Sequence, residues 1–257
     1  MFLLLCVWEM AAAVRRECGS SLAGLFAAAL FISVPNVPLI ASWGYAEAPF
    51  WLMTTCGLAS FLRWRHESRR ADAVLAALFA AGAALTKNEG LLFALLFGLL
   101  FVLSGSGRMK AAGLYLLALA GGSAFWFWWS RLYLDLAAPS VASGLRHLDA
   151  ESLRRAARRI VPAGKAICAM WQDIRQWNLV GFAAGIALFA AAVQRKHGTG
   201  LLLLPIGLLA GYFATILLNS NEIYWQIGTA WNRLTVQFLP LLLILLMPIF
   251  WTRPRYD

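Results

Sequence analysis

Long apolar stretches, separated by short polar or basic segments, occupy most of the chain. These stretches are residues 1–14, 21–34, 46–62, 72–86, 90–104, 111–129, 179–193, 201–218 and 235–251. A segment in lipid must satisfy its own backbone groups, so each stretch is expected to be helical. Several are shorter than the roughly 20 residues of a full crossing, which tilting would accommodate. The pattern predicts an all-α, polytopic transmembrane bundle of about nine helices, with residues 1–257 forming a single membrane domain.

Composition supports this interpretation. Of the 257 residues, 61% are hydrophobic and only 13% are charged, whereas soluble domains carry about 25% charged residues. The stretch 201–218 contains no charged residue at all. A single water-soluble core could not hide so much apolar surface. The four cysteines (Cys6, Cys18, Cys56 and Cys168) show no metal-ligand spacing and predict no disulfide.

The net charge of +10 has a different meaning in a membrane protein than in a soluble one. In a soluble protein it would suggest a nucleic-acid partner, but here the basic residues lie between apolar stretches. If residues 15–19 are cytoplasmic, alternation places twelve basic residues of the short loops and the C-terminal tail on that side. Only Lys87 and Arg233 then lie in short external loops. This asymmetry predicts a cytoplasmic C-terminus and no nucleic-acid partner.

Residues 130–178 form the one long external segment, and an amphipathic helix is predicted within it at 149–160. Asp149 can cap this helix, and Pro162 and Gly164 are expected to end it. Its apolar face holds Leu153, Ala156, Ala157 and Ile160, while its basic face holds Arg154, Arg155, Arg158 and Arg159. Such a helix lies on a membrane surface, either as a simple connector or as a binding site for anionic lipid head groups.

Four polar positions interrupt the apolar pattern, all on the predicted external side. Ionisable residues near membrane spans are costly, so they are candidates for function. The residues concerned are Glu47, Lys87 with Glu89, Glu222, and Arg233.

Each of these positions also has a structural interpretation. Glu47 could balance a helix dipole, or present a carboxylate that binds a sugar hydroxyl, binds a metal or assists a base. Lys87 and Glu89 could pair with each other at a tight turn, or the lysine could bind a phosphate beside backbone NH groups. Arg233 could extend to the membrane surface, or bind two phosphate oxygens.

Three short patterns resemble the bacterial GT-C glycosyltransferases, a group that includes protein mannosyltransferases and the aminoarabinose transferase of lipid A. Residues 44–49 read Gly-Tyr-Ala-Glu-Ala-Pro, similar to the family's Gly-Tyr-Ala-Asp-x-Pro. Residues 84–90 read Ala-Leu-Thr-Lys-Asn-Glu-Gly, similar to its Leu-Thr-Lys-x-x-Gly turn. Arg233 followed by Pro240 is similar to its late Arg…Pro span. The order and spacing of the three extend the resemblance over nearly the whole chain.

The resemblance implies a membrane glycosyltransferase of the bacterial inner membrane and cell envelope. It would move a sugar from a polyprenyl phosphate to a lipid, glycan or protein acceptor at the external face. Glu47 matches the family's second acidic position and is the candidate catalytic residue. The candidate substrate-binding residues are Tyr45, Lys87, Glu89, Glu222 and Arg233. No ligand spacing indicates a metal, although a divalent cation is one ligand that a lone carboxylate could bind.

The first apolar stretch opens at Met1 without a basic leader, unlike a signal peptide. The family's main catalytic carboxylate lies in an external loop after the first span, and no such loop is found here. The sequence therefore predicts a chain that lacks an upstream portion, with a genuine short protein whose N-terminus is external as the alternative. Three hypotheses follow: a glycosyltransferase, an incomplete non-catalytic fragment of one, and a non-enzymatic lipid-binding or transporter-type membrane protein.

Overall fold

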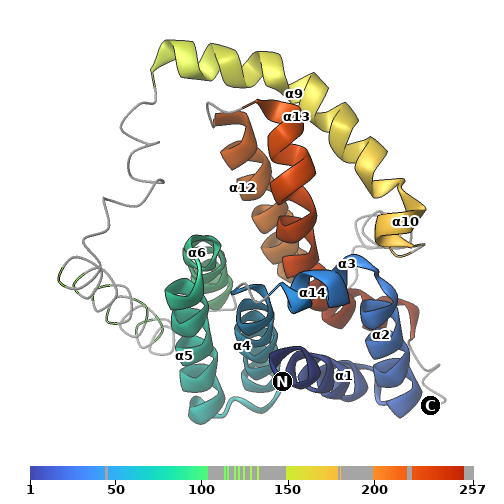
Figure 1. Cartoon of the computed structure of the whole chain (residues 1–257). Coiled ribbons are helices and arrows are strands. Elements are labelled where there is room, and N and C mark those ends of the chain that lie inside the picture. Colours follow the sequence, from blue (N-terminus) through green and yellow to red (C-terminus); the bar gives the residue numbers. More distant parts are fainter. Residues whose placement is uncertain are drawn as a thin grey trace.

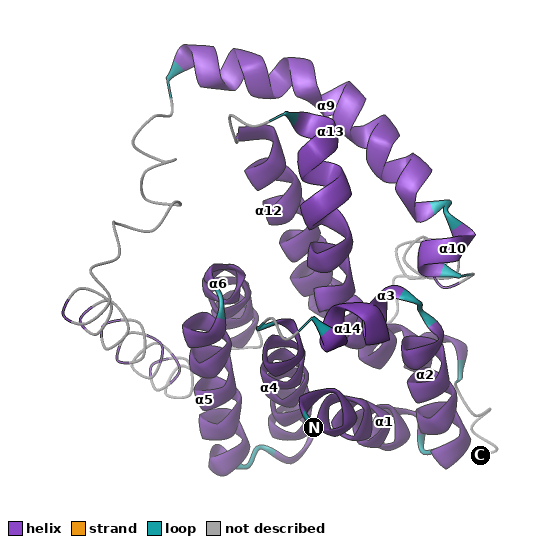
Figure 2. Cartoon of the chain, viewed as in Figure 1, coloured by secondary structure: helices purple, strands orange, loops and turns teal. Residues whose placement is uncertain are grey.

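The all-α class is confirmed. The computed structural model describes residues 1–43, 46–103, 113, 115, 119, 121, 124, 128, 132, 149–178, 180, 199–218 and 222–251, and the regular elements within them are helices (Figure 2). The elements before the long external segment are α1 (Phe2–Cys18), α2 (Ser21–Ser33), α3 (Asn36–Ser42), α4 (Glu47–Glu67), α5 (Arg70–Thr86) and α6 (Asn88–Leu103). Those after it begins are α9 (Ala150–Trp171), α10 (Ile174–Trp177), η2 (Thr199–Leu202), α12 (Leu203–Leu218), α13 (Ile223–Gln226), the π-helical turn η3 (Ile227–Trp231) and α14 (Asn232–Phe250).

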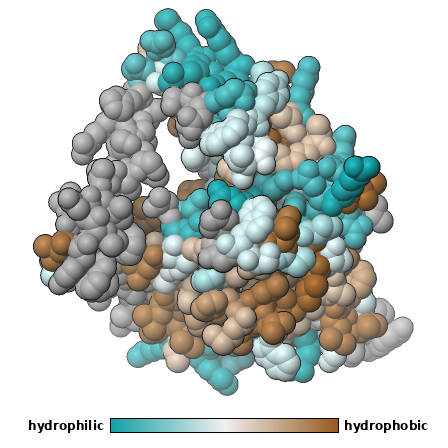
Figure 3. All heavy atoms as spheres, in the orientation of Figure 1, coloured by the Kyte–Doolittle hydropathy of each residue, from teal (hydrophilic) through white to brown (hydrophobic). Residues whose placement is uncertain are grey.

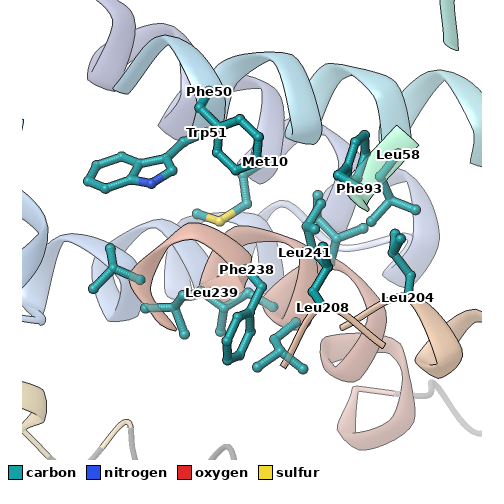
Figure 4. Close-up of a cluster of buried hydrophobic side chains, with 14 of the residues drawn as sticks. Met10, Phe50, Trp51, Leu58, Phe93, Leu204, Leu208, Phe238, Leu239 and Leu241 are labelled. Carbon is teal, nitrogen blue, oxygen red and sulfur yellow. The ribbon is translucent and has the colours of Figure 1, made fainter. Parts of the chain in front are cut away.

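Helix α14 lies at the centre of the described fold, between the helices α1 to α4 and the helix α12. It contacts α1, α2, α3 and α4 on one side and α12 on the other (Figure 1). The pairs α1–α2, α4–α5 and α5–α6 are joined by only one or two residues and pack against each other, as short connections require. Figure 4 shows the resulting core, in which Met10, Trp51, Phe93, Leu208 and Leu241 come from five different helices.

The described helices do not support the predicted number of nine membrane helices. One continuous helical run, Ile223–Phe250, is long and apolar enough to cross a membrane. Within it, 72% of the most apolar 18-residue portion is buried inside the protein. The pair Ser21–Ser33 and Asn36–Ser42, bent by 68°, passes the same criterion only if it is counted as one span. The remaining apolar helices are shorter, and the predicted stretches 111–129 and 179–193 lie almost wholly outside the described residues.

One helix boundary differs from the sequence-based prediction. The amphipathic helix was expected to end near Pro162, but α9 continues to Trp171, so that predicted end is wrong. A proline removes a single backbone donor, and on a helix at the surface the carbonyl left without it can be solvated.

Helix α9 lies across the ends of the apolar helices, not alongside them. In Figure 1 it runs over the ends of α12 and α13, and it contacts α12, α13 and η3. Asp149 accepts a hydrogen bond from the backbone NH of Ser152 at 2.8 Å, so the predicted cap is confirmed. The same backbone NH holds the pKa of Asp149 below its ordinary value.

Candidate functional site

Glu47, Lys87 and Arg233, which are far apart in the sequence, meet at one end of the bundle. Lys87 Nζ donates to Glu47 Oε1 at 2.9 Å, and Arg233 Nη1 lies 3.5 Å from the same oxygen. The Glu47 side chain is 1% exposed, that of Lys87 15% and that of Arg233 34%. We call these three residues the Glu47 cluster. The structure thus brings together the candidate catalytic carboxylate and the two candidate phosphate-binding cations.

Glu47 owes its position to the start of α4. It is the first residue of that helix, after Ala46, and Pro49 follows within the first turn, where a proline costs no hydrogen bond. The positive end of the helix dipole favours a carboxylate there. Arg233 lies inside the continuous helical run Ile223–Phe250, shortly after the π-helical turn η3. The cluster therefore joins the start of α4 to the interior of that run.

Lys87 is placed by a very tight turn between α5 and α6. Its backbone is extended, with φ −153° and ψ 155°, and it ends α5 without any intervening loop. Gly90 makes the turn possible, because a Cβ at that position would lie 1.9 Å from the carbonyl oxygen of Ala83. A side chain cannot fit at that distance, so a glycine is required for the start of α6 to approach the end of α5.

The Glu47 cluster pairs two cations with one carboxylate and leaves one acceptor without a described donor. Two cations share one carboxylate oxygen, while the other oxygen, Oε2, is buried and has no hydrogen-bond partner among the described residues. A buried acceptor without a donor is costly. An incoming hydroxyl would satisfy that oxygen, and an incoming anion could accept hydrogen bonds from the two cations. The cluster can therefore hold a group that brings both.

Comparison with known proteins assigns no role to this cluster. No family model, curated protein or solved structure matches the chain. The role of the Glu47 cluster therefore rests on its geometry, its burial and its charge.

Two other predicted site residues, Glu89 and Glu222, do not join the cluster. Lys87 pairs with Glu47 rather than with Glu89. The nearby Tyr212 hydroxyl donates to Gln237 Oε1 at 3.0 Å. Tyr45 lies outside the described residues.

Glu222 acts as a helix cap. Its two carboxylate oxygens accept the backbone NH groups of Tyr224 at 3.0 Å and Trp225 at 2.6 Å, at the start of α13. These hydrogen bonds hold the pKa of Glu222 below its ordinary value. The side chain stabilises the local turn, and the predicted substrate-binding role has no geometric support among the described contacts.

A chain of hydrogen bonds that the sequence did not reveal connects α10 to the start of α14. Gln176 Nε2 donates to Asp173 Oδ2 at 2.8 Å, Asn232 Nδ2 donates to Gln176 Oε1, and Trp177 Nε1 donates to Asn232 Oδ1 at 3.2 Å. Because Asn232 directly precedes Arg233, this chain fixes the backbone that carries the second cation. Only the polar pair Asn232-Arg233 at the head of an apolar stretch could have indicated it.

A second ionic cluster, also missed, joins the middle and end of α1 to the end of α4 and the start of α5. Glu9 Oε1 accepts from Arg16 at 3.1 Å and from Arg63 at 3.3 Å, and Arg63 also pairs with Asp72 at 3.0 Å. We call these four residues the Glu9 cluster. Glu9 was overlooked because it stands alone within an apolar stretch.

The described residues give little support to a metal site. None of them form a group of three or more His, Cys, Asp or Glu side chains that could hold an ion. At Glu47, the positive charges of Lys87 and Arg233 would compete with any divalent cation for the same oxygen. The chemistry that fits the cluster is the binding of an anion together with a hydroxyl.

Proposed function

We propose that the chain is a membrane glycosyltransferase that moves a sugar from a polyprenyl phosphate to an acceptor hydroxyl at the external membrane face. The Glu47 cluster is the observation that carries this proposal. It provides a buried carboxylate for the acceptor and two cations for the phosphate, and it lies at the end of the bundle away from the basic segments around Arg15 and Arg70.

Exposed apolar side chains support the membrane part of the proposal. Leu4 and Trp8 on α1 are 70% and 75% exposed, and Leu25 on α2 is 66% exposed. Leu78 on α5 and Leu95 on α6 are more than half exposed. In Figure 3 apolar residues form a band with hydrophilic residues above it and at the lower rim. Such a band would be unfavourable in water and suits the hydrocarbon layer of a bilayer.

The two cations suit a leaving phosphate. When a sugar is transferred from a polyprenyl phosphate, the bond between the anomeric carbon and the phosphate oxygen breaks, and its electron pair goes to the phosphate. Lys87 and Arg233 would stabilise that charge in a site with little water. Because both are partly buried, their interaction with phosphate would be stronger than that of exposed cations.

The carboxylate suits an attacking hydroxyl. Glu47 Oε2 is buried and has no described partner, so an acceptor hydroxyl could donate its hydrogen bond there. As the hydroxyl oxygen forms its bond to the anomeric carbon, the proton passes to Glu47. Lys87 and Arg233 pair with the carboxylate before the reaction and would stabilise the departing phosphate after it.

Transfer of labelled sugar in proteoliposomes tests the proposal. The reconstituted chain would receive a labelled sugar on undecaprenyl phosphate, with isolated cell envelope as the source of acceptor. We expect transfer by the wild type and a loss of about 10²–10⁴-fold in Glu47→Gln, the usual contribution of a positioned base. Glu9→Gln, at the opposite end of the bundle, is the control and should retain wild-type transfer.

Two results would overturn the proposal. Wild-type transfer by Glu47→Gln would remove the role of the carboxylate. Binding of the donor lipid by the wild type without any transfer would favour the non-enzymatic alternative, in which the same residues hold a lipid phosphate.

A further inference from the structure

Helix α9 packs on the protein along only part of its apolar side. Ala163 and Ile167 are buried against the bundle. Leu153 and Ile160 precede Ile167 at seven-residue spacing and so continue this side of the helix, yet they are 58% and 49% exposed, and Val161, nearer the basic side, is 63% exposed. Large apolar side chains left outside the protein in this way are unusual for a surface helix.

A basic side of the helix lies next to Val161. Helix α9 carries five basic residues and one acidic residue. Two of the arginines interact with the protein: Arg155 donates to Ser152 Oγ at 3.2 Å, and Arg159 acts electrostatically on Glu222. The remaining three, which form no ion pair among the described residues, are Arg154, Arg158 and Lys165. Their helical spacing places all three on one side.

We infer that α9 is a docking surface for the head groups of anionic lipids. The exposed apolar stripe would enter the boundary between head groups and acyl chains, and Arg154, Arg158 and Lys165 would bind lipid phosphates. The position of α9 fits this partner, because it lies across the ends of the apolar helices α12 and α13 (Figure 1). A nucleic acid would match the charge, but it would leave Leu153, Ile160 and Val161 exposed to water.

The inference rests on the membrane embedding in the proposed function, and one reporter distinguishes the two. Cys168 is exposed on α9, whereas Cys6 and Cys18 are buried and Cys56 is partly buried. By helical spacing it lies near the apolar stripe of Val161 and Leu153. A nitroxide attached at Cys168 of the full chain in nanodiscs reports its surroundings through collisions with oxygen, which enters lipid, and with a neutral nickel chelate, which does not. Cys168→Ser gives the background labelling.

We expect Cys168 to be accessible to oxygen and protected from the chelate. The protection should be several-fold greater in nanodiscs containing phosphatidylglycerol than in pure phosphatidylcholine. Replacing Arg154, Arg158 and Lys165 with Gln should abolish that difference, because each basic residue near an anionic surface strengthens association about fivefold. Replacing Arg15, Arg69 and Arg70 with Gln removes the same charge from the opposite end of the bundle and should leave the difference unchanged. All six side chains are exposed, so neither variant removes a buried contact.

A second label, introduced as Leu78→Cys on α5, separates the two ways of failing. Chelate access at Cys168 with protection at position 78 would overturn the inference and leave the membrane embedding intact. Chelate access at both positions would overturn the embedding and the inference together. Protection at Cys168 that does not depend on lipid charge would overturn the role of the three basic residues.

Discussion

The two ends of the bundle use the same ionic arrangement for different purposes. In both the Glu47 cluster and the Glu9 cluster, two cations share one carboxylate oxygen. Glu9 is 23% exposed, and the addition of Asp72 gives two acids for two bases. Glu47 is 1% exposed, and its second oxygen is buried without a hydrogen-bond partner among the described residues. Burial and this unsatisfied acceptor, and not ion pairing itself, therefore distinguish the candidate site.

The difference has an energetic reason. Exposed ion pairs contribute little because water already solvates both charges. A buried carboxylate without sufficient donors is costly to maintain, so a fold retains one where it serves binding or catalysis. The ion pairs of the Glu9 cluster hold α1, α4 and α5 together. The Glu47 cluster, in contrast, leaves a buried carboxylate oxygen without a hydrogen-bond partner among the described residues.

The largest expected effect comes from removing each shared carboxylate. Glu47→Ala leaves two partly buried cations without their common partner, and we expect the free energy of unfolding to fall by about 3–5 kcal/mol. Glu9→Ala, in a more exposed cluster, should cost about 1 kcal/mol or less. Thermal unfolding of both variants in the same detergent measures the difference. Equal losses would remove the distinction between the two ends.

A smaller effect is expected at the turn that places Lys87. Gly90→Ala forces the backbone apart from Ala83, and overpacking of this kind lowers the free energy of unfolding by about 1–3 kcal/mol. Gly164→Ala is the matched control, because a Cβ there meets nothing within 4 Å. In a helix that substitution should stabilise by up to about 1 kcal/mol. A neutral Gly90→Ala would show that the turn tolerates a side chain.

The hydrogen bonds between α10 and α14 should give a further, smaller loss. Gln176→Ala removes the partner of Asn232 and should lower the free energy of unfolding by about 0.5–1.5 kcal/mol. Gln172→Ala removes an exposed glutamine from the same segment and should have little effect. Urea unfolding followed by tryptophan fluorescence would compare the two. If both behave as the wild type, the chain of hydrogen bonds does not hold the start of α14.

The smallest effect concerns acid pH. The pKa of Glu222 is lowered by backbone hydrogen bonds from Tyr224 and Trp225. Its stabilising contribution is therefore complete above its ordinary pKa of 4.5 and is lost as pH falls through the lowered value. The melting temperature of the wild type should fall more steeply than that of Glu222→Gln below this pH. Parallel curves would show that the cap does not contribute.

Much of the helical layout follows from the sequence because apolar stretches and their polar breaks mark helix ends directly. The stretch 72–86 became α5, and the break at Lys87 is a true boundary. The end of α9 was predicted wrongly from Pro162, because a proline weakens a helix without always ending it. The contacts of α9 with neighbouring helices allow it to continue.

The candidate site was predictable as a set of residue types but not as a set of contacts. Charge in apolar surroundings identified Glu47, Lys87 and Arg233, and their predicted location at one end brought them into one hypothesis. Lys87 pairs with Glu47 and not with Glu89, which is nearer in the sequence, because of how α4 packs against α5. Glu222 shared the same polar signal but caps a helix, because a sequence does not show which backbone groups lie nearby.

Binding of undecaprenyl phosphate to the reconstituted chain tests the Glu47 cluster most directly. Lys87→Met should weaken binding about 10–100-fold, as expected for the loss of a hydrogen bond from a charged donor. Glu47→Gln should bind the lipid more tightly than the wild type, because no carboxylate then competes for the two cations. Arg63→Met, at the Glu9 cluster, should bind as the wild type does. Equal affinity in the wild type, Lys87→Met and Glu47→Gln would contradict the account.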